Sequence, residues 1–156
     1  MTPEDFINAI APDAIASARE TQVPASFTIA EAALESGWGN HAPGHNLFGV
    51  KADARWDGPT TVQRTREFIA GTWTMAFARF RAYDDWLGSI RDHAGFLRSN
   101  PRYSRCFEAA DSIAFTRQVA VAGYATDPKY AEDIITIISQ YGLQRYDPQP
   151  EGDQNA

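Results

Sequence analysis

The stretch Glu35-Ser36-Gly37-Trp38-Gly39, followed seven residues later by Asn46-Leu47-Phe48-Gly49, is the most informative part of the chain. It follows residues 25–34, where apolar side chains recur at helical spacing just after Pro24, a residue suited to the start of a helix. Gly37 is expected to end that helix. The motif therefore places one carboxylate in the last turn of an apolar helix, immediately before a tryptophan framed by glycines.

The setting of Glu35 is expected to raise the pKa of its carboxyl group. The last helical turn is the negative end of the helix dipole, a neighbouring indole excludes water, and Glu31 adds a like charge one turn earlier. Each effect disfavours the ionised form, so the group is predicted to stay protonated near neutral pH. A protonated carboxyl can give its proton to a leaving oxygen, as cleavage of a glycosidic bond requires. Taken alone, Glu35 could also be a solvated surface residue.

Composition limits the classes of function. A chain of 156 residues with 44% hydrophobic side chains suits one domain with a substantial core. Its net charge of -6 argues against a nucleic-acid partner, because phosphate contacts need clustered basic residues. Cys106 is the single cysteine, which excludes an internal disulfide. His41 and His45 have the spacing of helical metal ligands, but Pro43-Gly44 between them argues against a helix, so neither a metal nor a cofactor is predicted.

The N-terminal segment has the pattern of neither a signal peptide nor a membrane span. Acidic residues precede the first basic one, Arg19, and no long apolar run is present. The chain is therefore expected to be made in the cytoplasm and to act without membrane insertion, or to be a domain of a larger protein. Residues 1–146 are predicted to form a single domain, and the polar residues 147–156 a disordered tail.

Most of the remaining chain has helical periodicity. A helix is predicted to open at Thr2-Pro3 and to break at Pro12. Three further helices are predicted where apolar residues line one face between capping and stop signals: from Asp84 or Asp85 to Asn100-Pro101, from Asp111 to Val121, and from Asp127-Pro128 to Gly142.

One region has the period of a strand instead. In residues 72–80, Trp73, Met75 and Phe77 alternate with small or polar neighbours, and residues 60–69 are similarly rich in Thr, Val and Phe. Ala70-Gly71 between the two runs offers a short turn, so a β-hairpin is predicted. The expected fold class is α+β, a helical body with one small projecting hairpin.

Five motifs stand in order along the chain: Glu35 to Gly39, Asn46 to Lys51, Phe80 to Tyr83, Asn100 to Tyr103 and Ala122 to Ala131. Together they resemble the glucosaminidase domain of glycoside hydrolase family 73. The resemblance covers roughly residues 3–143 and implies a lysozyme-like, mainly helical body with a small β-hairpin lobe across the active-site cleft. It also implies an endo-β-N-acetylglucosaminidase that cleaves the bond between N-acetylglucosamine and N-acetylmuramic acid in peptidoglycan, without a cofactor.

Carried over residue by residue, the resemblance assigns three catalytic side chains. Glu35 matches the general acid of the family. Glu67, on the predicted hairpin, matches its second carboxylate, which would activate water or stabilise positive charge on the sugar ring. Asp53 and Asp57, in the preceding loop, are rival candidates. Tyr124 is expected to point its hydroxyl into the cleft, where it could orient the substrate or the water.

Substrate contacts are expected from Trp38, Asn46, Phe48 and Tyr130. The indole of Trp38 could stack on a sugar ring or anchor the turn after Glu35 against the core. Asn46 and Phe48 are expected to shape the floor of the cleft.

Other functions fit the same residues. A lytic transglycosylase or a muramidase could use this fold, and a non-catalytic glycan-binding assembly protein could keep it without turnover. The expected partner is the peptidoglycan glycan strand, bound by a monomer with no nucleic acid. A phage endolysin released through a holin, a virion-borne enzyme and an exported protein are all compatible settings.

Overall fold

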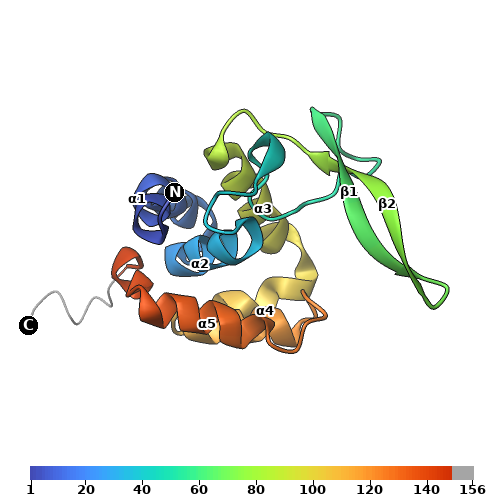
Figure 1. Cartoon of the computed structure of the whole chain (residues 1–156). Coiled ribbons are helices and arrows are strands. Elements are labelled where there is room, and N and C mark those ends of the chain that lie inside the picture. The colour runs from blue at the N-terminus through green and yellow to red at the C-terminus, as the bar shows by residue number, and fades with distance from the viewer. Residues whose placement is uncertain (149–156) are drawn as a thin grey trace, which may run out of the picture.

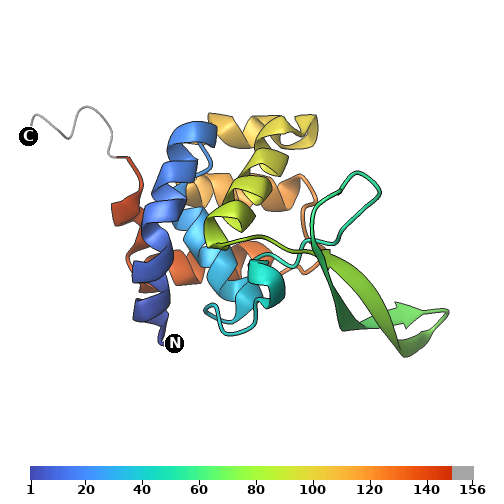
Figure 2. The ribbon, with the colours of Figure 1, turned by 90° about the horizontal axis from the view of Figure 1, so that it is seen from above.

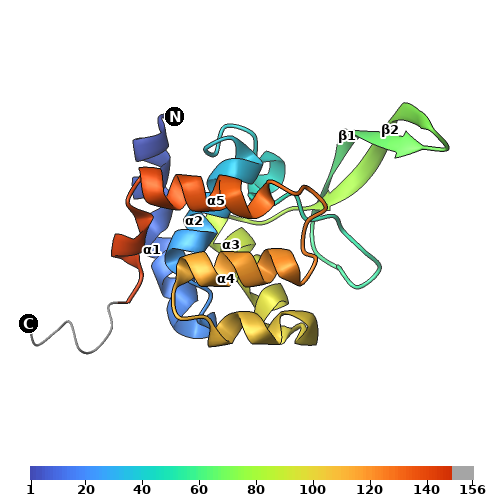
Figure 3. The same cartoon turned by 90° about the horizontal axis from the view of Figure 1, so that it is seen from below.

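The helical body is built around α2 (Ala25–Ser36), as Figures 1 and 3 show. In this computed structural model, which describes residues 1–148, α2 contacts α1, α4 and α5 and is buried on nearly all sides. Its alanines allow the neighbouring helices to approach closely, and a helix that is apolar all round is expected in the interior. The other helices are α1 (Pro3–Thr21), α3 (Trp86–Ser99), α4 (Ser112–Val121) and α5 (Tyr130–Gln140), with short 3-10 helices η1 (Pro43–His45), η2 (Pro101–Glu108) and η3 (Leu143–Tyr146).

Helix α1 begins as predicted but does not break at Pro12. The hydroxyl of Thr2 accepts the backbone N–H of Asp5 at 3.1 Å, which caps the first turn. Pro12 lies inside the continuous helix, and Ile10, Ala11 and Ala14 around it are buried in the core. Proline within a helix costs about 3 kcal/mol. Burial of the apolar face therefore outweighs the local penalty, and the predicted break is wrong.

The N-terminus of α2 is capped by a residue distant in the sequence. Pro24 precedes the helix and provides no side-chain cap, but the carboxylate of Asp147 accepts the backbone N–H of Ser26 at 2.9 Å and also its hydroxyl. Asp147 belongs to the segment predicted to be a disordered tail, so that segment starts with a residue fixed to the body. Residues 149–156 of the predicted tail lie outside the described residues.

The remaining helices follow the predicted pattern, with one shifted boundary. Asp85 caps α3 and Asp111 caps α4, each by accepting a backbone N–H three residues later. The last helix was predicted from Asp127 and begins instead at Tyr130, because the carboxylate of Asp127 accepts the N–H of Lys129 at 2.9 Å and closes a turn before the helix.

The predicted β-hairpin is confirmed. Strands β1 (Thr60–Ile69) and β2 (Thr72–Arg81) pair antiparallel, and Ala70 and Gly71 both have positive φ, as a two-residue type I′ hairpin turn requires. The base of the hairpin is hydrogen-bonded to the body, with the N–H of Arg81 donating to Val50 at 3.0 Å and that of Ala52 to Arg79 at 2.9 Å. The strands then project away from the helices (Figures 1 and 2).

Candidate active site

The turn after α2 is fixed by packing. Gly37, Trp38 and Gly39 all have positive φ, a conformation that strains any residue other than glycine. A Cβ on Gly39 would lie 2.7 Å from the ring of Phe6, so glycine is required there. The Trp38 ring meets the rings of Phe6 and Tyr141 edge to face, with centroids 6.2 and 4.8 Å away. Trp38 therefore anchors this turn against the core, the second of its two predicted roles.

Glu35 lies in the last turn of α2, as predicted, and it is exposed at the surface. Partial burial of the carboxyl group raises its pKa, and the charge of Glu31 raises it further. Both causes disfavour the ionised form. The predicted direction of the shift is confirmed, and burial is the larger cause.

Glu31, one turn earlier, is the most enclosed charged residue of the body. Its side chain is fully buried, and burial raises its pKa to about 7, although the nearby hydroxyls of Tyr124 and Tyr130 act in the opposite direction. Neither carboxylate oxygen has a hydrogen-bond partner of regular geometry among the described residues. A buried group in this position is stable chiefly in its neutral form.

His93, on α3, connects Glu31 to Tyr124. Its Nε2 lies 2.7 Å from the Tyr124 hydroxyl and 3.4 Å from a carboxylate oxygen of Glu31. Burial lowers the pKa of His93 to about 4. The pKa of Glu31 is raised and that of His93 is lowered, and each shift favours the neutral form of its group. The contact between His93 and Glu31 is therefore not an ion pair at neutral pH. The imidazole also stacks on Phe48, with ring centroids 4.0 Å apart, which places Phe48 beneath this cluster.

Tyr124 and Tyr130 complete the cluster, with ring centroids 5.4 Å apart. Burial raises the pKa of each phenol, and the charges of Glu31 and Glu35 add to the effect. Both phenols therefore stay protonated and can donate a hydrogen bond. The structure thus brings Tyr124 and Tyr130 within electrostatic reach of Glu35.

Glu67 has a different environment, on β1 of the projecting hairpin. Its carboxylate lies 3.3 Å from the ammonium of Lys51 and accepts the hydroxyl of Thr65 at 3.1 Å. The hydrogen bond from Lys51 is the largest cause of a lowered pKa, followed by that from Thr65. Glu67 is therefore ionised at neutral pH, and it is not part of the cluster around Glu31. Glu35 and Glu67 have pKa shifts of opposite sign, the arrangement that separates an acid from a base.

The two rival carboxylates have other surroundings. Asp53 accepts the backbone N–H of Arg55 at 3.0 Å and lies 3.6 Å from the guanidinium of Arg81, so it closes its loop onto the base of the hairpin. Asp57 is exposed in the same loop. The contacts of Asp53 are those of a residue that holds the loop in place.

Asn46 is buried, and the amide and carbonyl groups of its side chain form hydrogen bonds within the protein. Its amide donates to the carbonyls of Val50 and Arg81, both at 2.9 Å, and its carbonyl accepts the N–H of Val50. The side chain therefore joins the loop after η1 to β2. This arrangement sets the position of the hairpin relative to the body.

From the sequence, Glu31 was expected only to add a like charge beside Glu35, and no role was expected for His93. A signal for His93 was available, since it shares the apolar face of α3 with Ile90, Ala94 and Leu97. A titratable residue on a core-facing stripe needs a partner. The partner could not be identified from the sequence, because Tyr124 lies on a later segment.

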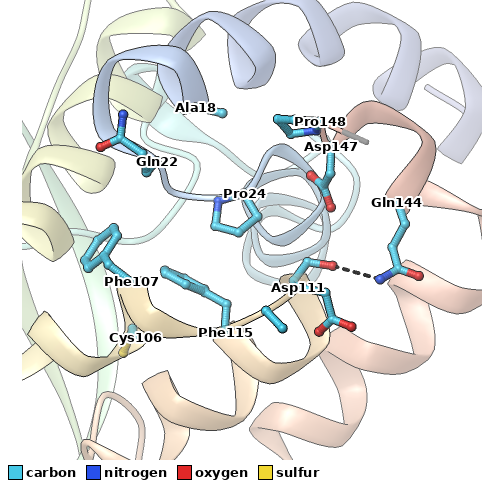
Figure 4. A pocket seen from close by; sticks show the side chains of 13 residues that line it. Ala18, Gln22, Pro24, Cys106, Phe107, Asp111, Phe115, Gln144, Asp147 and Pro148 are labelled. Atoms are coloured by element: carbon cyan, nitrogen blue, oxygen red, sulfur yellow. Dashed lines mark hydrogen bonds between the residues drawn. The ribbon is translucent and has the colours of Figure 1, made fainter. Parts of the chain in front are cut away.

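A separate cavity of about 420 Å³ lies between the end of α1 and the start of α4 (Figure 4). Its lining includes Phe107, Phe115, Gln144 and Asp147, and none of the predicted site residues.

In residues 1–148, no three His, Cys, Asp or Glu side chains gather as a metal site would require. None of the helices in that range combines the length and apolarity needed to cross a bilayer.

Comparison with known proteins gives one consistent family. The Glucosaminidase family, described as mannosyl-glycoprotein endo-beta-N-acetylglucosaminidase, matches residues 11–143. The peptidoglycan hydrolase FlgJ of Vibrio parahaemolyticus is 38% identical over 143 residues, which are 87% of this chain and 46% of that protein. The chain therefore spans less than half the length of this relative.

Two solved structures have the same fold. A C-terminally truncated glycoside hydrolase domain of FlgJ from Salmonella typhimurium is 36% identical, with a TM-score of 0.78 over 91% of this chain and 99% of that one. The catalytic domain of the autolysin Auto from Listeria monocytogenes is 32% identical, with a TM-score of 0.84 over 93% of this chain and 87% of that one. The predicted lysozyme-like α+β fold is confirmed.

Proposed function

The chain belongs to the glucosaminidase family, and on that premise we propose that it is a peptidoglycan hydrolase that cleaves the β-1,4 bond between N-acetylglucosamine and N-acetylmuramic acid. The observation that supports this most directly is the pair of carboxyl groups with opposite pKa shifts, Glu35 raised and Glu67 lowered. Such a pair provides a proton donor and an ionised carboxylate in one protein.

In the proposed reaction, Glu35 protonates the glycosidic oxygen as the bond to the leaving sugar breaks. Partial burial raises the pKa of this group and so favours its protonated form, and the packed turn around Trp38 holds α2 in position. General acid catalysis of this kind contributes about 10²- to 10⁴-fold to the rate. When Glu31 is ionised, its charge raises the pKa of Glu35 further.

Water then attacks the anomeric carbon, and we propose that Glu67 is the base that accepts its proton. Lys51 and Thr65 keep this carboxylate ionised and oriented. Glu67→Gln is expected to lower turnover about 10²- to 10⁴-fold. Full activity of this variant would instead indicate that the acetamido group of the substrate assists the attack.

Tyr124 is proposed to orient the substrate or the attacking water through its hydroxyl. His93 holds that hydroxyl at 2.7 Å, and the raised pKa keeps it protonated. We propose that Trp38, Phe48, Asn46 and Tyr130 shape the site around it, with Asn46 and Phe48 acting from buried positions.

Degradation of purified peptidoglycan by the protein and two variants tests the proposal. Glu35→Gln should abolish release of soluble fragments, while its melting temperature stays close to that of the parent. Glu20→Gln is the matched control, because Glu20 also lies near the C-terminal end of a helix with an exposed side chain, 52% accessible. Fragment release by Glu35→Gln at the parent rate would exclude Glu35 as the acid.

We also propose that the protein acts on the cell wall as a monomer and without nucleic acid. It would reach the wall through a holin, in a virion or by export of a longer chain. Analytical ultracentrifugation at working concentration tests the monomer. A lytic transglycosylase or a muramidase would use the same acid but leave different sugar ends, and an assembly protein would release no fragments.

A further inference from the structure

One face of the hairpin exposes apolar and basic side chains together. In the observed register, Val62 pairs with Arg79, Arg64 with Phe77, Arg66 with Met75, and Phe68 with Trp73. Side chains of these pairs point to the same side of the sheet, opposite to Thr65 and Glu67. We call this surface the basic-apolar face; it consists of Val62, Arg64, Arg66, Phe68, Trp73, Met75, Phe77 and Arg79.

The apolar residues of this face are exposed to an unusual degree. Its five apolar side chains are between 52% and 72% accessible, and Ile69 at the tip is 54% accessible. A two-stranded hairpin without a covered apolar face is marginal by itself, and in the described part of the chain this one is joined to the preceding loop by backbone hydrogen bonds near its base and by the contact between Lys51 and Glu67. Contiguous exposed apolar surface on a soluble domain marks a site of interaction.

The charges of the face select the partner. Residues 60–81 contain four arginines and one glutamate, a net charge of +3 in a chain whose net charge is -6. Arg64, Arg66 and Arg79 are exposed, and no carboxylate within residues 1–148 lies at salt-bridge distance from them. The guanidinium of Arg66 lies over the Trp73 ring, 4.8 Å from its centroid. The partner must therefore be anionic, and it must also accept apolar side chains.

We propose that the basic-apolar face docks on the surface of a lipid bilayer with anionic headgroups. Each arginine near such a surface raises the affinity of a protein for the bilayer about fivefold, and tryptophan and phenylalanine favour the boundary between headgroups and acyl chains. The hairpin projects from the body, so its tip can reach the headgroups while the helical body stays away (Figures 2 and 3). Docking of this kind is interfacial adsorption and requires no spanning segment.

Other partners match the face less well. A second copy of the same face would bring arginine against arginine. A nucleic-acid strand would stack on Phe68, Trp73 and Phe77 but would gain nothing from Val62 and Met75. A glycan strand could stack on Trp73 and accept hydrogen bonds from the arginines, but the strand cleaved in the proposed reaction lies on the side of Glu67, which is the other side of the sheet. The net charge of -6 was used above only as an argument against a nucleic-acid partner, and this value for the whole chain conceals the local excess of positive charge on the hairpin.

Cosedimentation with lipid vesicles tests the proposal in the absence of any glycan. The protein should bind vesicles of phosphatidylcholine mixed with phosphatidylglycerol, bind vesicles of phosphatidylcholine alone far less, and dissociate as salt is raised. Replacing Arg64, Arg66 and Arg79 together by Gln should weaken binding on the order of a hundredfold, and replacing any one of them about fivefold. Trp73→Thr with Phe77→Thr should also weaken it.

The matched control is Arg117→Gln with Val121→Thr, which removes one exposed arginine and one exposed apolar residue from α4. It should bind as the parent does. The proposal is overturned if the parent shows no preference for anionic vesicles, or if the control weakens binding as much as the hairpin variants. It is also overturned if single-stranded DNA binds the face more tightly than the vesicles. Loss of activity on purified peptidoglycan in proportion to vesicle binding would assign the face to the glycan site instead.

Discussion

Replacing Glu31 by Gln is expected to stabilise the protein at neutral and alkaline pH and to leave its stability nearly unchanged in acid. The side chain is fully buried, and burial raises its pKa from 4.5 to about 7. In the unfolded chain the carboxyl group loses its proton near pH 4.5, whereas in the folded protein it keeps the proton until about pH 7. Because the folded state binds more protons over this window, the free energy of unfolding falls as the pH rises through it.

The size of the effect follows from the difference between the two pKa values. At about 1.4 kcal/mol per pKa unit, the difference corresponds to about 3 kcal/mol. Below pH 4.5, a protonated glutamic acid and a glutamine have the same charge and nearly the same shape. Above about pH 7, the parent holds a buried charge that the variant lacks. The variant should therefore gain about 3 kcal/mol relative to the parent across this range, roughly 6 to 12 °C in melting temperature for a chain of this length.

Urea denaturation followed by circular dichroism, repeated from about pH 4 to about pH 8, measures this difference. Burial lowers the pKa of His93 to about 4. The contribution of His93 to the free energy of unfolding is therefore lost as the pH falls from 6.5 toward 4. His93 is present in both proteins, so the difference between variant and parent at each pH reports chiefly on Glu31. A flat difference for Glu31→Gln would refute the assignment of a buried, neutral carboxyl group.

Three further substitutions test the packing and the site. Gly39→Ala should lower the free energy of unfolding by about 1 to 3 kcal/mol, because its Cβ would lie 2.7 Å from Phe6 where φ is 80°; an unchanged urea midpoint would contradict this packing. Asp147→Ala removes the cap of α2 and should cost about 1 kcal/mol in the same measurement; no loss would mean that the cap is dispensable. Tyr124→Phe should reduce turnover of purified peptidoglycan and, because buried His93 loses its hydrogen-bond partner, lower stability by about 1 to 3 kcal/mol. Full turnover would separate the hydroxyl from the reaction.

The elements of the fold could be predicted where local signals agree. The two strands of the hairpin have a period of two and meet at Ala70-Gly71, and the observed strands and turn coincide with that pattern. Helix α3 has a capping residue, an apolar face and a stop signal in sequence. Pro12 misled the prediction because the local penalty is outweighed by tertiary packing, which a sequence pattern does not report.

The candidate site also combines features that neighbouring residues in the sequence predict with features that only the packed fold produces. The place of Glu35 at the end of an apolar helix follows from its neighbours in the sequence, and the direction of its pKa shift was predicted from them. The burial of Glu31 depends on His93, Tyr124 and Tyr130, which come from three later segments. Their convergence is a property of the packed fold. The contact between Glu67 and Lys51 likewise depends on how the hairpin lies over the preceding loop.

The sugar ends left on purified peptidoglycan test the central claim most directly. Fragments released by the protein are reduced with borohydride and identified by mass spectrometry, beside a digest with Glu35→Gln. The proposed function predicts reduced N-acetylglucosamine ends that are absent from the variant digest. Anhydromuramic ends, reduced muramic acid ends or no fragments at all would contradict it.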